Sequence, residues 1–166
     1  NWGEQCEQDL NKQINLELLA SHQYLFLSSH FNRDDVALKP LSDFLNKCSL
    51  EERGHAQKLI DYQNMRGGIV VLTNVADPNI KFTSNNKVLE ALNFVLILEK
   101  TVNKSLLDLH TTAENENDPQ FGDYIEGEFL NEQVEAISEI SKYITQIEFI
   151  GNNNYGIWEF INKTFS

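Results

Sequence analysis

Residues 45–59 read LNKCSLEERGHAQKL, and this stretch decides the fold. Steps of three and four residues place five of its side chains on one face of an α-helix: Leu45, Cys48, Glu52, His55 and Leu59. Glu52 and His55, three residues apart, therefore point the same way. Because an unpaired carboxylate in an apolar core costs several kcal/mol, the stretch predicts an inward helix face that holds a cation.

Helical periodicity divides the whole chain into four long helices and a short one. They are expected at about residues 4–31, from 40 to Gly67-Gly68, from a cap at 84–86, from Asp118-Pro119 to 150, and at 155–164. The connection at 67–84 has no helical pattern. About eighteen extended residues reach roughly 60 Å, whereas a helix of about 28 residues is about 42 Å long. The sequence therefore predicts one all-α domain over residues 1–166: a four-helix bundle with one long crossover and a short fifth helix at the C-terminus.

Polar side chains interrupt the apolar stripes of the other long helices as well. Glu17 lies on the stripe of the first helix and Glu99 on that of the third. In the fourth helix Gln133 faces inward, and Glu132 lies at the edge of the stripe. One such acid is usually a helix-end or interface residue, but one on each of several packed helices indicates a shared metal site.

Di-iron bundles place one Glu on each of two helices and a Glu-x-x-His pair on each of the other two. This chain has one such pair, Glu52 and His55, because Glu135 stands where the second histidine is expected. The predicted site is therefore lopsided. One position would have Glu17, Glu52 and His55, and the other Glu52, Glu99 and Gln133. Carboxylate and imidazole ligands suit iron, although zinc and manganese also accept them.

The overall charge limits the partners. A formal net charge of -12 favours cations over nucleic acid. No apolar run reaches the roughly 18 residues of a membrane span, so no membrane partner is expected. Cys6 and Cys48 do not make a disulfide framework, which indicates reduced thiols and a cytoplasmic location. The chain starts at Asn1, so we expect it to be trimmed or partial, and secretion is not favoured.

Five stretches resemble ferritin closely: QINLEL at 13–18, FNRDDVAL at 31–38, EERGHA at 51–56, QNMRGG at 63–68 and LNEQV at 130–134. The similarity covers nearly the whole chain and is strongest to the catalytic, heavy-type subunit. The resemblance implies a ferritin-like bundle that oxidises Fe(II) with O2 at a ferroxidase centre of two irons. It also implies a 24-subunit cage, as a homo-oligomer or mixed with another ferritin subunit, that stores ferric mineral.

The resemblance also assigns roles to individual residues. The ferroxidase centre corresponds to Glu17, Glu52, His55, Glu99 and Gln133. Tyr24 corresponds to the family's tyrosine beside that centre, and Glu51 to an acid that faces the cavity and passes iron onward. Asp123 and Glu126 correspond to acids of the three-fold entry channels, with His110 near the same pores. Gly54 and Gln57 replace cavity-facing acids that many members carry, so mineral nucleation is expected to be weaker or displaced.

Three alternatives stay open at this stage. A structural, light-type ferritin subunit would build the shell without oxidising iron, although the complete ligand set disfavours it. A twelve-subunit relative that protects DNA would lack the helix expected at 155–164. A secreted iron carrier is disfavoured because the chain has no cysteine framework.

Overall fold

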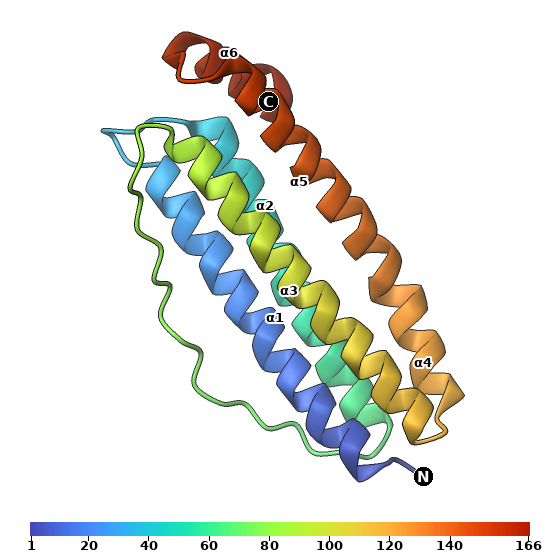
Figure 1. The fold of residues 1–166 in the computed structure, drawn as a ribbon. Coiled ribbons are helices and arrows are strands. Elements are labelled where there is room, and N and C mark those ends of the chain that lie inside the picture. The colour runs from blue at the N-terminus through green and yellow to red at the C-terminus, as the bar shows by residue number, and fades with distance from the viewer.

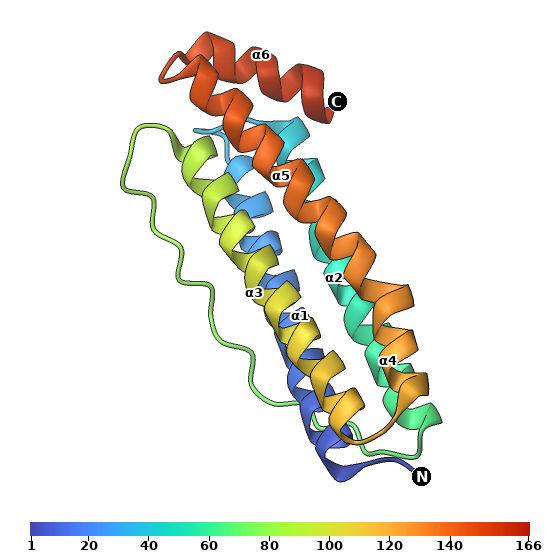
Figure 2. The ribbon, with the colours of Figure 1, turned by 45° about the vertical axis from the view of Figure 1, so that its right-hand side comes forward.

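The computed structural model describes residues 1–166, and all of its regular secondary structure is helical, which confirms the predicted fold. The elements are α1 (Glu4–Phe31), α2 (Lys39–Met65), α3 (Lys87–Asn115), α4 (Pro119–Ile125), a π-helical turn at Glu126–Leu130, α5 (Asn131–Ile150) and α6 (Asn154–Phe165). α1, α2, α3 and the α4–α5 stretch form the bundle, and α6 lies across its end (Figures 1 and 2). No helix combines the length and apolar character needed to cross a membrane.

The predicted crossover runs along the outside of the bundle, from the end of α2 to the start of α3 (Figure 1). Three α1 side chains hold it, those of Glu7, Asn11 and Asn15. Asn11 Nδ2 donates to Ile69 O at 2.9 Å, and Asn11 Oδ1 accepts from Val71 N at 3.1 Å. Asn15 makes the same pair of bonds to Val71 O and Thr73 N, at 3.2 and 3.1 Å. Each side-chain amide thus donates to one backbone oxygen of the crossover and accepts from one backbone N–H, as the backbone of a neighbouring β-strand would. These backbone groups would otherwise have no partner within the crossover.

Several helix ends lie where cap chemistry predicts them. Asn86 Oδ1 accepts from Leu89 N at 3.0 Å at the start of α3, and Asp118 Oδ1 accepts from Phe121 N at 3.0 Å at the start of α4. Gly67 (φ +83°) follows α2, and Gly151 (φ +68°) ends α5. Only glycine adopts these left-handed conformations without strain, so the two residues fix where the helices stop.

The fourth helix differs from the prediction of one uninterrupted helix over 118–150, because a π turn separates α4 from α5. Four buried residues here recur at steps of four: Phe121, Ile125, Phe129 and Gln133. In an α-helix each such step overshoots a full turn by about 40°, so three steps would carry Gln133 off the buried face. The wider turn takes up the excess and keeps Gln133 directed into the bundle.

Serine pairs hold α1 close to α2. Ser28 Oγ donates to Ser42 O at 2.8 Å, and Ser42 Oγ donates to Ser28 O at 2.7 Å. Ser21 and Ser49 repeat this reciprocal arrangement further along the two helices, nearer to Glu52. All four serines are buried, so these bonds satisfy polar groups that would otherwise be costly.

Gly54→Ala is expected to raise the free energy of unfolding by about 0.5–1 kcal/mol, because glycine inside a helix is destabilising relative to alanine. A Cβ at Gly54 would meet no atom within 4 Å. Gly68→Ala is the control in which the free energy of unfolding is expected to fall. A Cβ there would lie 2.3 Å from Gln63 Oε1 and 2.7 Å from Trp2 Nε1, and these two atoms are joined by a hydrogen bond. Denaturant unfolding of the metal-free proteins measures both. A Gly54→Ala protein less stable than the parent would refute the first expectation.

Candidate metal centre

The first half of the site lies between α1 and α2. Glu17 from α1 is fully buried, Glu52 from α2 is 4% exposed, and His55 follows one turn later. One ligand atom from each of these three residues lies within 4.8 Å of the others. His55 Nδ1 is 3.4 Å from Glu52 Oε2 and 4.0 Å from Glu17 Oε2. The residues expected at the first metal position are therefore brought together.

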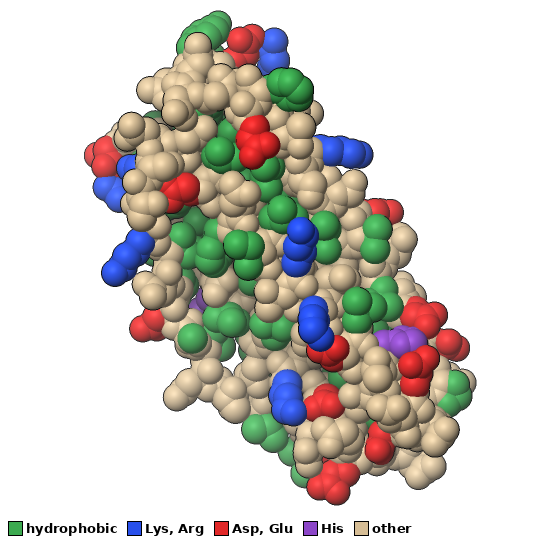
Figure 3. Space-filling model, in the orientation of Figure 1, with side chains coloured by type: hydrophobic (Ala, Val, Ile, Leu, Met, Phe, Trp, Pro, Cys, Tyr) green, Lys and Arg blue, Asp and Glu red, His purple; other side chains and the backbone are tan.

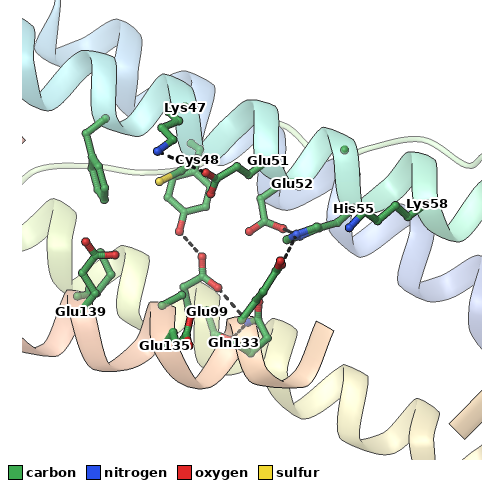
Figure 4. A pocket seen from close by; sticks show the side chains of 16 residues that line it. Lys47, Cys48, Glu51, Glu52, His55, Lys58, Glu99, Gln133, Glu135 and Glu139 are labelled. Atoms are coloured by element: carbon green, nitrogen blue, oxygen red, sulfur yellow. Dashed lines mark hydrogen bonds and ion pairs between the residues drawn. The ribbon is translucent and has the colours of Figure 1, made fainter. Parts of the chain in front are cut away.

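The second half faces it from α3 and α5 (Figure 4). Gln133 Nε2 donates to Glu99 Oε2 at 2.9 Å and to the Glu99 backbone oxygen at 3.1 Å. The Tyr24 hydroxyl donates to Glu99 Oε1. Both carboxylate oxygens of Glu99 thus have donors, and Gln133 and Tyr24 fix its orientation. The residues expected at the second position, together with the tyrosine, converge as well.

Burial dominates the electrostatics of this cluster. It raises the pKa of Glu17 well above its usual value, and the neighbouring Glu52 raises it further. Burial also raises the pKa of Glu52 to about 7, while the interaction with Glu17 lowers it and the charge of Glu99 raises it. Neither lysine nor arginine forms an ion pair with any of these three acids; His55 is the one basic partner. The protein therefore places no lysine or arginine where it would stabilise the ionised acids, and a bound cation would do so.

Glu132 lies outside the core but contacts the site. Its side chain is 56% exposed, and its Oε2 is 2.9 Å from His55 Nε2. A carboxylate on one ring nitrogen fixes the orientation of the imidazole and leaves the other nitrogen for a metal. Helical spacing indicated only that Glu132 lies at the stripe edge; its contact with His55 depends on how α5 packs beside α2.

A cleft of about 530 Å³ opens beside the two halves, lined by residues of α1, α2, α3 and α5 (Figure 4). Glu51 lies at its wall, exposed, with its Oε1 3.9 Å from Lys47 Nζ. Gly54 and Ala136 also line the cleft, and their small size widens it. The cleft gives an ion and a small molecule room to approach Glu52 and Glu99.

The remaining predicted residues lie elsewhere, at the end of the bundle near α4. Asp123 and Glu126 line one surface hollow of about 410 Å³, together with His110 and Glu114. Glu126 Oε1 is 2.6 Å from His110 Nε2. Figure 3 shows acidic side chains gathered around a histidine at this end. Asp123 and Glu126 thus share a face and form a second acidic feature separate from the central cluster.

This helical bundle, with one long crossover and a buried carboxylate–histidine cluster, has the architecture of the metal-binding four-helix bundles. The family model described as Ferritin, Ferritin-like domain, matches residues 7–150. The chain belongs to the ferritin family.

Its relatives are plant proteins. It is 46% identical over 162 residues to "Ferritin, chloroplastic" of Malus baccata var. xiaojinensis, covering 96% of this chain and 64% of the relative. It is 47% identical over 157 residues to "Ferritin-2, chloroplastic" of Zea mays, with 93% and 62% covered. It is 44% identical over 161 residues to "Ferritin-4, chloroplastic" of Arabidopsis thaliana, with 96% and 62% covered. The chain thus spans less than two thirds of the length of these relatives.

The expected cytoplasmic location is wrong by this comparison, because these relatives are named chloroplastic ferritins. The expectation rested on Cys6 and Cys48, which are indeed unpaired. Free thiols separate reducing from oxidising compartments. They do not distinguish one reducing compartment from another, so the cysteines could not identify the location.

Proposed function

We propose that this chain is a heavy-type ferritin subunit that oxidises Fe(II) with O2 and stores the ferric product inside a 24-subunit cage. The supporting observation is the cluster of three buried acids and His55, which has no lysine or arginine partner. Carboxylate and imidazole donors suit iron. Membership of the ferritin family supports storage of iron, and the names of the relatives support a plastid location.

The proposed ligand roles follow from position. Glu17 and His55 serve one iron, and Glu99 with the Gln133 amide oxygen serves the other. Glu52 serves both, since it lies beside Glu17 and also feels the charge of Glu99. Two Fe(II) bound there as substrate would supply the two electrons, and water the two protons, that reduce O2 to hydrogen peroxide. Hard anionic oxygens favour Fe(III) over Fe(II), which helps the oxidation.

Acidic residues outside the proposed ligand set would serve iron entry and exit. Asp123 and Glu126, with His110, would form rings of negative charge at a three-fold contact and raise the local concentration of Fe(II). Glu51 would receive iron that leaves the cleft. Because Gly54 and Gln57 carry no charge, the proposed path inward has fewer carboxylates than many family members offer.

Exposed apolar side chains support the proposed assembly. Leu25 is 52% exposed on α1, and Ile69, Val71 and Leu72 are 71%, 51% and 61% exposed on the crossover. Apolar surface of this kind marks protein contacts. Light scattering of the purified protein would give the number of subunits, and a stable monomer or a twelve-subunit particle would refute the 24-subunit cage.

The proposed activity is tested by adding two Fe(II) per subunit to the metal-free protein and then admitting O2. A fast phase of O2 uptake, complete within one turnover of the bound iron, is expected. A purely structural, light-type subunit would take up O2 no faster than free Fe(II) in the same buffer. That outcome would overturn the ferroxidase proposal.

A further inference from the structure

Two residues outside the proposed ligand set, the half-buried Ser105 and the buried Gln13, connect to Glu17 through a chain of hydrogen bonds. Ser105 Oγ on α3 donates to Gln13 Oε1 on α1 at 2.5 Å. Gln13 Nε2 in turn donates to Glu17 Oε1 at 2.9 Å. Gln13 is 1% exposed and lies one helical turn before Glu17. The two hydrogen bonds therefore link α3 to the Glu17 carboxylate across the interior of the bundle.

These hydrogen bonds give the two carboxylate oxygens of Glu17 different surroundings. Oε1 is occupied by the Gln13 amide, whereas Oε2 is buried, has no hydrogen-bond partner and lies 4.0 Å from His55 Nδ1. The hydrogen bonding of Glu99 is different, because Tyr24 donates to one of its carboxylate oxygens and Gln133 donates to the other. Only Glu17 presents a buried carboxylate oxygen without a partner, and that oxygen faces Glu52 and His55.

Ser105 donates the hydrogen bond that holds the Gln13 amide in this orientation. Glu17 Oε1 accepts this hydrogen bond, and only the NH2 end of an amide can donate, so the NH2 end of Gln13 must face Glu17. The carbonyl end is then buried, and leaving it without a donor would be destabilising. The Ser105 hydroxyl donates to it. Gln13 orients Glu17, and Ser105 orients Gln13.

We propose that Gln13 and Ser105 are positioning residues that commit Glu17 Oε1 to the protein and present Oε2 alone to the first metal ion. The inference rests on the proposed metal centre and adds to it two residues that bind no metal. Partners of metal ligands typically contribute 10- to 100-fold to metal affinity. Without Gln13, Glu17 is free to rotate or to bind through both oxygens, which changes the geometry of the site as well as its affinity.

The test is Co(II) binding to the assembled, metal-free protein, followed by calorimetry and by the ligand-field absorption of Co(II). Gln13→Leu, which keeps the volume and removes the donor, is expected to weaken the first Co(II) site about 10- to 100-fold and to change its spectrum. Ser105→Ala is expected to give a smaller loss in the same direction. Ser105→Thr keeps the hydroxyl and should restore affinity and spectrum to those of the parent.

Ser28→Ala is the matched control, because it also removes a serine hydrogen bond between two helices, here from α1 to Ser42 O on α2, but lies away from the cluster. It should lower stability without changing the Co(II) spectrum. If the parent binds Co(II) and both Gln13→Leu and Ser105→Ala bind it with the same affinity and spectrum, the positioning inference is overturned while the metal centre stands. If the parent shows no Co(II) site, the proposed metal centre fails, and this inference fails with it.

Discussion

Glu52→Gln is expected to lower the initial rate of Fe(II) oxidation roughly 100-fold or more, which corresponds to about 3 kcal/mol. The amide keeps the shape of the side chain but loses the charge and the second anionic oxygen. Glu52 is the acid proposed to serve both irons, so its loss separates the two halves of the site. Stopped-flow O2 uptake with two Fe(II) per subunit measures the effect.

Glu135→Gln is the control for the loss of one negative charge. Glu135 also lines the cleft but is exposed and hydrogen-bonds to Asn131 on its own helix. Its variant should keep the fast phase. A Glu52→Gln protein that oxidises iron at the parental initial rate would contradict the assignment of the bridging carboxylate.

The metal-free protein is expected to become less stable as the pH rises from about 5 to 8. The pKa values of Glu17 and Glu52 are raised in the folded state, that of Glu52 from 4.5 to about 7. Between these values the folded protein binds more protons than the unfolded one, so the free energy of unfolding falls with pH. For Glu52 the full loss is about 3 kcal/mol and is reached above pH 7. Denaturant unfolding in metal-free buffers at several pH values measures it.

Two further measurements isolate the cause of that pH dependence. Glu52→Gln should flatten the decline, so the variant that loses oxidation should gain stability at pH 8. A saturating divalent cation should restore the parent at pH 8, because it binds the folded carboxylates. Asp9 and Asp118 have lowered pKa values from a usual 3.8, so their effect falls at lower pH. A metal-free parent equally stable at pH 5 and pH 8 would argue against buried, uncompensated acids.

Short-range chemistry explains the parts of the fold that the sequence predicted. The helix of residues 45–59 follows from apolar spacing, and its ends follow from backbone chemistry, as at Gly67. Glu52 and His55 share a face because three residues make nearly one helical turn. The crossover followed from length, since the connection had to span a bundle about as long as its helices.

Contacts between helices required the tertiary structure. The bonds of Tyr24 to Glu99, His55 to Glu132, and Ser105 to Gln13 each join residues more than seventy positions apart. Each depends on how far one helix is rotated against another, and helical periodicity defines a face without fixing that rotation. The resemblance to ferritin supplied the site residues that spacing alone left open. The π turn was partly predictable. The recurrence of inward residues at steps of four is visible in the sequence, but the widening of the helix, which keeps Gln133 in contact with Glu99 on α3, was seen only in the tertiary structure. The sequence by itself thus determined which helices form and which faces are apolar, because these depend on neighbours along the chain. The tertiary structure decided which carboxylate oxygen is left free, because that depends on donors from other helices.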